Sequence, residues 1–182
     1  MTDEIKKRLD VVLVAGGKYH DIDFARLELL KLLAEDERIR TRVYEDYSNL
    51  HAISNADFLI TYTCDVRPTL EQQKVLRDFV ANGKRWLALH GTNSILQFLS
   101  DGRVDCPRVA PIFMETLGSQ FLSHPPIEPY TVTVADGDHH LVDGVEPFQT
   151  NDELYLMETH GELHVLLETE FEGNTPGFVE EN

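Results

Sequence analysis

The pattern of hydrophobic positions in the first half of the chain predicts the strands of a buried sheet. Residues 10–15 form an uninterrupted apolar run, and residues 57–63 form a second run that is rich in β-branched and aromatic side chains. Runs of this length are typical of strands that are covered on both faces. Residues 41–45 alternate between polar and apolar side chains and predict a shorter strand, and residues 85–89 predict a fourth strand that is buried.

Two amphipathic segments between these runs predict helices. One covers residues 21–34, where Asp21 or Asp23 is expected to be the N-cap. The other covers residues 69–83 and begins with Thr69 and a glutamine three residues later, which is the spacing of a capping box. In the first helix the recurring apolar positions are Phe24, Leu27, Leu30 and Ala34.

The order strand, helix, strand, strand, helix, strand predicts an α/β fold with a parallel sheet and right-handed crossovers. The length of 182 residues fits one domain, 1–182, around one substantial core. Five prolines between residues 102 and 129 predict an elaborated loop region. Beyond it, strands are predicted at 130–134 and 164–169, with a turn-rich loop at 136–144.

The charge balance narrows the classes of partner. The net charge is −16, from 32 acidic and 16 basic residues, and this excludes a nucleic-acid partner because contacts to phosphate require a basic surface. All 16 Lys and Arg residues lie in residues 1–108, whereas residues 109–182 contain 15 acidic residues and no basic one. A solvated acidic surface explains this asymmetry, and a cation site or a covering basic segment is the alternative.

The location of the protein is predicted from what the sequence lacks. No apolar run reaches the roughly 20 residues of a membrane span, and the charged N-terminus lacks the apolar block of a secretory signal. Two cysteines outside any CxxC pair suit a reducing compartment. We therefore expect a cytoplasmic protein without a membrane partner, and the acidic second half favours a homo-oligomer.

The candidate site lies on the loops that follow three predicted strands. In an open parallel sheet, ligands bind beyond the carboxyl ends of the strands, where loop backbones and helix N-termini converge. These loops are 16–20, 64–67 and 90–94. Their candidate binding residues are Gly16, Gly17, Asp65, Gly91, Thr92 and Asn93.

Two histidines are the candidate catalytic residues. His90 follows a strand at a strand-to-helix turn, a place that holds nucleophiles in several enzyme classes, and His20 is expected to face it from the neighbouring strand. A helix-capping role for His90 is the structural alternative. Cys64 could be an activated thiol at the same edge, or a small buried apolar residue. The Gly16-Gly17 pair is part of no GxGxxG or GxxxxGK[ST] motif, so no nucleotide cofactor is expected.

The acidic second half supplies further polar groups for this crevice. They are His124, His140, Asp152, Glu153 and Tyr155. Imidazoles and carboxylates of this set could bind a divalent metal together with His20 or His90, but no spacing as specific as HExxH singles out a ligand set. The sequence therefore leaves the metal ligands unassigned.

Five short motifs occur in an order that resembles the ThuA-like, or trehalose-utilisation, family. They are Gly16-Gly17 with His20, Trp86 to Gly91, Leu117 to Pro125, Asp138-His139-His140, and Asp152 to Tyr155. The resemblance spans about residues 10–158. It implies a class I glutamine amidotransferase-like, flavodoxin-like fold with a mostly parallel sheet and helices on both faces, and a role in sugar metabolism.

The chain departs from this resemblance at three places. Glutamine amidotransferases have a nucleophilic cysteine at the turn that here holds His90, so no glutaminase activity is expected. The family has His-Pro where this chain has His140-Leu141. The family's closing strand and Gly-His motif are also expected to be absent after Asn182.

Two functions remain open at this point. The first is an enzyme that converts a trehalose-type sugar or an oxidised glycoside, with His90 and His20 as acid/base or metal-ligating groups. The second is a non-catalytic small-molecule-binding or scaffold domain on the same fold, because a fold by itself does not determine a site.

Overall fold

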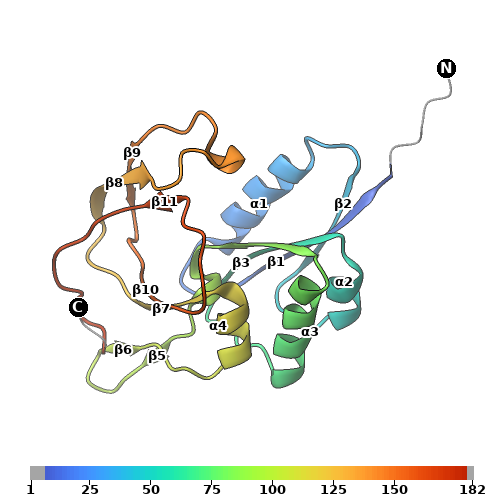
Figure 1. The fold of residues 1–182 in the computed structure, drawn as a ribbon. Helices are drawn as coiled ribbons and strands as arrows, with labels where there is room; N and C mark the ends of the chain where they lie inside the picture. Colours follow the sequence, from blue (N-terminus) through green and yellow to red (C-terminus); the bar gives the residue numbers. More distant parts are fainter. Residues whose placement is uncertain (1–6, 180–182) are drawn as a thin grey trace. The chain divides into compact units, whose positions relative to one another are not determined.

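The computed structural model describes residues 7–179 and divides them into two compact units. Residues 7–95 and 108–117 form the first unit, and residues 96–107 and 118–179 form the second. In the first unit, four parallel strands lie in the order β2-β1-β3-β4. Figure 1 labels β1, β2 and β3 of this sheet. The strands are β1 (Leu9–Gly17), β2 (Ile39–Tyr44), β3 (Phe58–Cys64) and β4 (Arg85–Leu89).

Helices cover both faces of this sheet, and the predicted flavodoxin-like α/β fold class is confirmed. The helix α1 packs on one face, and α2, α3 and α4 pack on the other. Their bounds are α1 (Ile22–Leu33), α2 (Leu50–Asn55), α3 (Leu70–Ala81) and α4 (Pro111–Leu117), and a short 3-10 helix, η1 (His90–Asn93), follows β4. Asp21 caps α1, and the capping box of α3 is present at Thr69.

The central strand β1 contributes side chains to two cores because successive side chains point to opposite faces. Val12 and Val14 pack with the α2, α3 and α4 side, whereas Val11, Leu13 and Ala15 pack with α1. All five side chains are buried. The apolar run at 10–15 therefore predicted a strand covered on both faces correctly.

Two predictions about buried faces are wrong. The strand β4 lies at the edge of the sheet and is not buried, since Arg85 and Ala88 are exposed and Leu87 is 50% exposed. The predicted apolar face of α1 is wrong at Phe24, which is 62% exposed, at Leu27, which is 51% exposed, and at Ala34, whereas Leu30 packs against the core as predicted. The residues of α1 that face the core are Ile22, Leu29, Leu30 and Leu33.

The second unit is built mainly from antiparallel pairs. Three strands lie in the order β11-β8-β9, and β10 pairs with β7 and β5 with β6. The strands are β5 (Gln97–Phe98), β6 (Val104–Asp105), β7 (Ser119–Ser123), β8 (Glu128–Val134), β9 (Phe148–Asp152), β10 (Leu156–Thr159) and β11 (Leu167–Glu168), with the 3-10 helix η2 (His140–Val142) between β8 and β9. Cys106, Phe121 and Phe178 form the buried centre of a small core.

The region predicted as a loop, residues 102–129, is more ordered than expected. It contains α4 and β7, and α4 begins at Pro111, where a proline is tolerated because the first helical N–H needs no intrahelical partner. The predicted strand at 130–134 is part of β8, but the one at 164–169 is reduced to the two residues of β11. Within residues 7–179, no helix is long and apolar enough to cross a bilayer.

Candidate functional site

Backbone hydrogen bonds join the three loops at the carboxyl edge of the first unit's sheet. The N–H of Lys18, after β1, donates to the carbonyl of Cys64 at the end of β3 over 3.0 Å. The N–H of Asp65 donates to the carbonyl of Ser94, after η1, over 2.9 Å. Because β3 lies between β1 and β4, these bonds hold the loops 16–20, 64–67 and 90–94 side by side.

Three glycines make this close approach possible. A Cβ atom at Gly17 would lie 1.9 Å from the Cys64 carbonyl oxygen, and one at Gly16 would lie 2.0 Å from the Glu45 carbonyl oxygen. At Gly91, a Cβ would lie 2.9 Å from both the Thr63 oxygen and the Cys64 Cβ. Each of the three predicted binding glycines is thus required by backbone packing.

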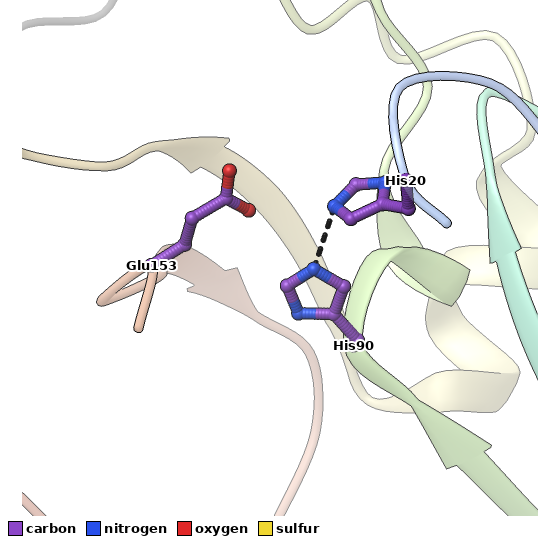
Figure 2. Close-up of side chains that lie close together, drawn as sticks. All are labelled: His20, His90 and Glu153. Carbon is purple, nitrogen blue, oxygen red and sulfur yellow. Dashed lines mark hydrogen bonds between the residues drawn. The ribbon is translucent and has the colours of Figure 1, made fainter. Parts of the chain in front are cut away.

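The structure brings the two predicted catalytic histidines into contact. The Nε2 atoms of His20 and His90 are 2.6 Å apart, and their rings are nearly perpendicular, with centroids 4.4 Å apart (Figure 2). His20 comes from the loop between β1 and α1, and His90 begins η1. The ring of Tyr62 stacks on His90 and meets the edge of His20. Both imidazoles are half-buried.

The hydrogen bonds of His20 define the tautomers of the neutral pair. Its Nδ1 lies 3.2 Å from the carbonyl oxygen of Lys18, which can only accept, so Nδ1 carries the proton. The Nε2 of a neutral His20 then has a lone pair, and Nε2–H of His90 must donate to it. The proton on His90 Nε2 therefore lies between the two Nε2 atoms, which face each other.

Left-handed backbone conformations occur in each of the three loops. Among residues 7–179, the non-glycine residues with positive φ are Tyr19 at 70°, Asp65 at 55° and His90 at 47°. This conformation costs an L-residue roughly 1–2 kcal/mol. Residues held in such conformations cluster at functional sites, where the surrounding structure compensates for the strain.

Replacing Tyr19 with glycine is therefore expected to give a more stable protein than replacing it with alanine. Tyr19 is exposed, so both variants lose the same side-chain contacts and differ in backbone strain. At positive φ, glycine should be favoured by about 1 kcal/mol, whereas at ordinary positions it is disfavoured by about 0.5–1 kcal/mol. Urea unfolding of the two variants measures the difference, and an alanine variant of equal or greater stability would show that the loop is unstrained.

The carboxylate of Asp65 forms ion pairs with the side chains of Lys18 and Arg67. Its side chain is 5% exposed and lies 3.0 Å from Lys18 Nζ and 3.3 Å from Arg67 Nε. The hydrogen bond that Lys18 donates to Asp65 raises the pKa of the Lys18 ammonium. Asp65, predicted as a sugar-binding residue, thus links the loop after β1 to the loop after β3.

Buried hydroxyl groups support the turn that carries His90. The hydroxyl of Thr92 donates to the Leu89 carbonyl over 2.8 Å and lies 3.1 Å from the hydroxyl of Thr61. Trp86 Nε1 also donates to the Thr61 hydroxyl, over 2.9 Å. Thr92 and Asn93, predicted as binding residues, are both buried. A buried hydroxyl group within an apolar strand needs a hydrogen-bond partner. Thr61 is therefore the residue from which this network could have been predicted.

Two further buried groups lie near this turn. The hydroxyl of Tyr47 lies 3.2 Å from that of Thr63, and burial raises the pKa of the Tyr47 phenol above its usual value, which keeps it neutral. Cys64 is buried, with its Cβ and Sγ packed close to Gly91. This packing matches the structural alternative for Cys64, that of a small buried residue.

The predicted site residues of the second unit fall into two clusters. In the first, His124 Nε2 is 3.8 Å from the Glu153 carboxylate, and the rings of His124 and Tyr155 both pack against Phe121. Asp152 accepts a hydrogen bond from the Glu153 N–H.

The second cluster contains His140, which was predicted as a site residue, together with residues that were not. His140 stacks on His139, which lies edge-on to His164, and His164 contacts Asp136 at 2.6 Å. The hydrogen bond from His164 lowers the pKa of the Asp136 carboxyl. His164 and Asp136 were not predicted as site residues, because nothing in the local sequence links positions 28 residues apart.

The second unit also contains a groove that the sequence did not reveal. A cavity of about 270 Å³ lies between the start of β8 and residues 171–174, with Leu154, Tyr130 and Phe171 among its lining residues. Burial raises the pKa of Tyr130, with a smaller contribution from the negative charge of Asp152. Most of the residues that line this cavity are apolar or aromatic, and Glu128 is the acidic residue among them.

Comparisons with known proteins agree with the fold. A putative ThuA-like protein from Bacteroides uniformis ATCC 8492 has a similar structure, with a TM-score of 0.70 and 17% identity over 90% of this chain and 69% of that one. A putative ThuA-like protein from Parabacteroides merdae ATCC 43184 gives a TM-score of 0.61 and 16% identity over 90% and 68% of the two chains. No curated protein matches the chain. The family model ThuA, described as trehalose utilisation, matches residues 10–181, and the chain therefore belongs to the ThuA family.

Proposed function

We propose that this protein is an enzyme that converts a trehalose-type sugar or an oxidised glycoside, with His20 and His90 as its proton-transfer groups. The family description, trehalose utilisation, supports the substrate class. The observation that carries the proposal is the 2.6 Å contact between the two Nε2 atoms. Both histidines lie at the carboxyl edge of a parallel sheet, where α/β proteins bind their ligands.

The histidine pair suits chemistry at a sugar hydroxyl or carbonyl group. Such reactions remove a proton from one oxygen or carbon atom and deliver one to another, and neutral imidazole does both near pH 7. In the neutral pair, His90 Nε2–H is the donor and His20 Nε2 is the acceptor. His20 Nε2 can therefore act as the base and His90 Nε2–H as the acid, and exchange with solvent removes the proton that His20 takes up and replaces the one that His90 gives.

A thermal-shift panel of disaccharides and oxidised glycosides tests this function. A ligand at 100 times its Kd should stabilise the wild-type protein by about 2.7 kcal/mol, and His20→Ala and His90→Ala should abolish that stabilisation. The control is His51→Ala, which removes an exposed histidine of α2 in the same unit and should respond as the wild type does. If no sugar stabilises the wild type, or if the variants respond as it does, the proposal is wrong.

The same panel separates an enzyme from a binding module. Sugars that stabilise the protein are incubated with it, and the products are analysed by mass spectrometry and chromatography. A converted sugar supports the enzyme, whereas tight binding without conversion of any sugar would support a non-catalytic binding domain on the same fold. Ammonia release from glutamine is not expected, because His90 stands at the turn where a glutaminase needs a thiol.

A further inference from the structure

We infer that His20 and His90 bind a divalent transition-metal ion, with the two Nε2 atoms as ligands. This inference rests on the proposed function only for the location of the site, and it describes a different state of the same pair, because an ion bound to both Nε2 atoms occupies the lone pairs that proton transfer would use. Both rings are half-buried and present Nε2 to one point (Figure 2). The two residues lie 70 positions apart in the chain, so the fold has to bring them together.

The distance between the nitrogens is close to what a metal ion requires. With metal–nitrogen bonds of about 2.0–2.1 Å, two neighbouring ligands lie about 2.9–3.4 Å apart. The observed separation is 2.6 Å, so the rings need to open by less than about 1 Å. Rotation of the two half-buried rings can supply this movement while the joined loops stay in place.

The surroundings of His20 resemble those of a metal-binding histidine. Such residues usually donate the hydrogen of their second ring nitrogen to a carbonyl or carboxylate, which orients the ring and fixes its tautomer. His20 Nδ1 has this partner in the Lys18 carbonyl, 3.2 Å away. The lone pair of Nε2 is therefore already directed at the metal position.

His90 needs one proton shift to become a ligand. In the neutral pair, the ring proton of His90 lies on Nε2. This proton has to move to Nδ1 of His90 when the ion binds to Nε2. Both imidazoles are then neutral donors through Nε2, and no proton is gained or lost by the pair. His90 is the first residue of η1 and has a positive φ, so its backbone is held in a strained conformation at the edge of the sheet.

Other histidine contacts in the described residues have less suitable geometry. His139 and His140 stack nearly parallel, so their nitrogens do not converge, and His139 Nδ1 accepts the Leu141 N–H. His164 directs its Nε2 to the carboxylate of Asp136. Among these contacts, that of His20 with His90 is the one in which two ring nitrogens meet.

The donor atoms select the class of metal. Neutral imidazoles favour Zn²⁺, Co²⁺, Ni²⁺ and Cu²⁺, whereas Mg²⁺ and Ca²⁺ prefer oxygen ligands. Two imidazoles leave coordination positions for oxygen atoms of water or a sugar. The net charge of −16 also favours the approach of a cation.

Cobalt titration of the full chain, stripped with a chelator, tests the inference. The visible absorption of Co²⁺ reports imidazole ligands, and calorimetry with Zn²⁺ gives the stoichiometry and Kd. We expect one ion per chain, with affinity lowered at least tenfold by His20→Ala and by His90→Ala. The His51→Ala and His164→Ala variants should bind as the wild type does, and Mg²⁺ should produce no heat. Circular dichroism confirms that each variant is folded.

The outcomes separate the metal inference from the proposed function. The metal site is ruled out if the wild type does not bind Co²⁺. It is also ruled out if His20→Ala and His90→Ala bind Co²⁺ as tightly as the wild type does. If sugars still stabilise the stripped protein in that case, the proton-transfer proposal stands without it. Co²⁺ binding that depends on both histidines supports the metal site even if no sugar in the panel binds. Should His90→Ala fail to fold, His90→Gln provides the same comparison.

Discussion

Replacing Gly17 with alanine is expected to destabilise the first unit by at least about 4 kcal/mol. The new Cβ would lie 1.9 Å from the carbonyl oxygen of Cys64, and φ at this position is +108°. The opposing atom belongs to the backbone of β3, so it cannot turn aside as a flexible side chain would. The loops after β1 and β3 would have to separate, and the Lys18 to Cys64 hydrogen bond would be lost.

Two other glycines provide matched controls for this experiment. Gly83 also has a positive φ, 78°, but no atom lies within 4 Å of its added Cβ, so Gly83→Ala should lose only about 1 kcal/mol. Gly137 has open space and needs no positive φ, so Gly137→Ala should stay within about 0.5 kcal/mol of the wild type. Urea unfolding followed by circular dichroism compares the three. If Gly17→Ala is as stable as Gly83→Ala, the close contact between the loops is not required for folding.

Removing either histidine of the pair should lower kcat/KM for the converted sugar by about 10²–10⁴-fold, and removing both should lower it little further. The reason is that the reaction uses one ring as the base and the other as the acid, with the two Nε2 atoms 2.6 Å apart, so the loss of either ring removes the contribution of the pair. The measurement is a double-mutant cycle with His20→Ala, His90→Ala and the double variant, using a sugar that the thermal-shift panel identifies.

The control for this cycle is His51→Ala, which should keep the wild-type kcat/KM because His51 lies on the exposed surface of α2. Losses that simply multiply in the double variant would show that the two histidines act independently. Losses confined to KM would show that they bind the sugar without taking part in the reaction.

Local signals along the chain predicted the central sheet and its best-capped helix. The apolar run in β1 and the capping box at Thr69 are local signals, because strand burial and helix capping depend on residues within a few positions of one another. The family motifs also marked the loops that hold Gly17, His20 and His90. These predictions needed no knowledge of distant contacts.

Tertiary structure decided which side chains meet and which face of each element is buried. The exposure of Phe24 and Leu87 depends on what packs against α1 and β4, and the local pattern contains no record of that packing. The structural tasks of Asp65 and Thr92 likewise come from partners 31 to 47 positions away. His20 and His90 became one proton-sharing pair only because parallel strands bring their carboxyl ends to a single edge, where residues 70 positions apart lie in contact.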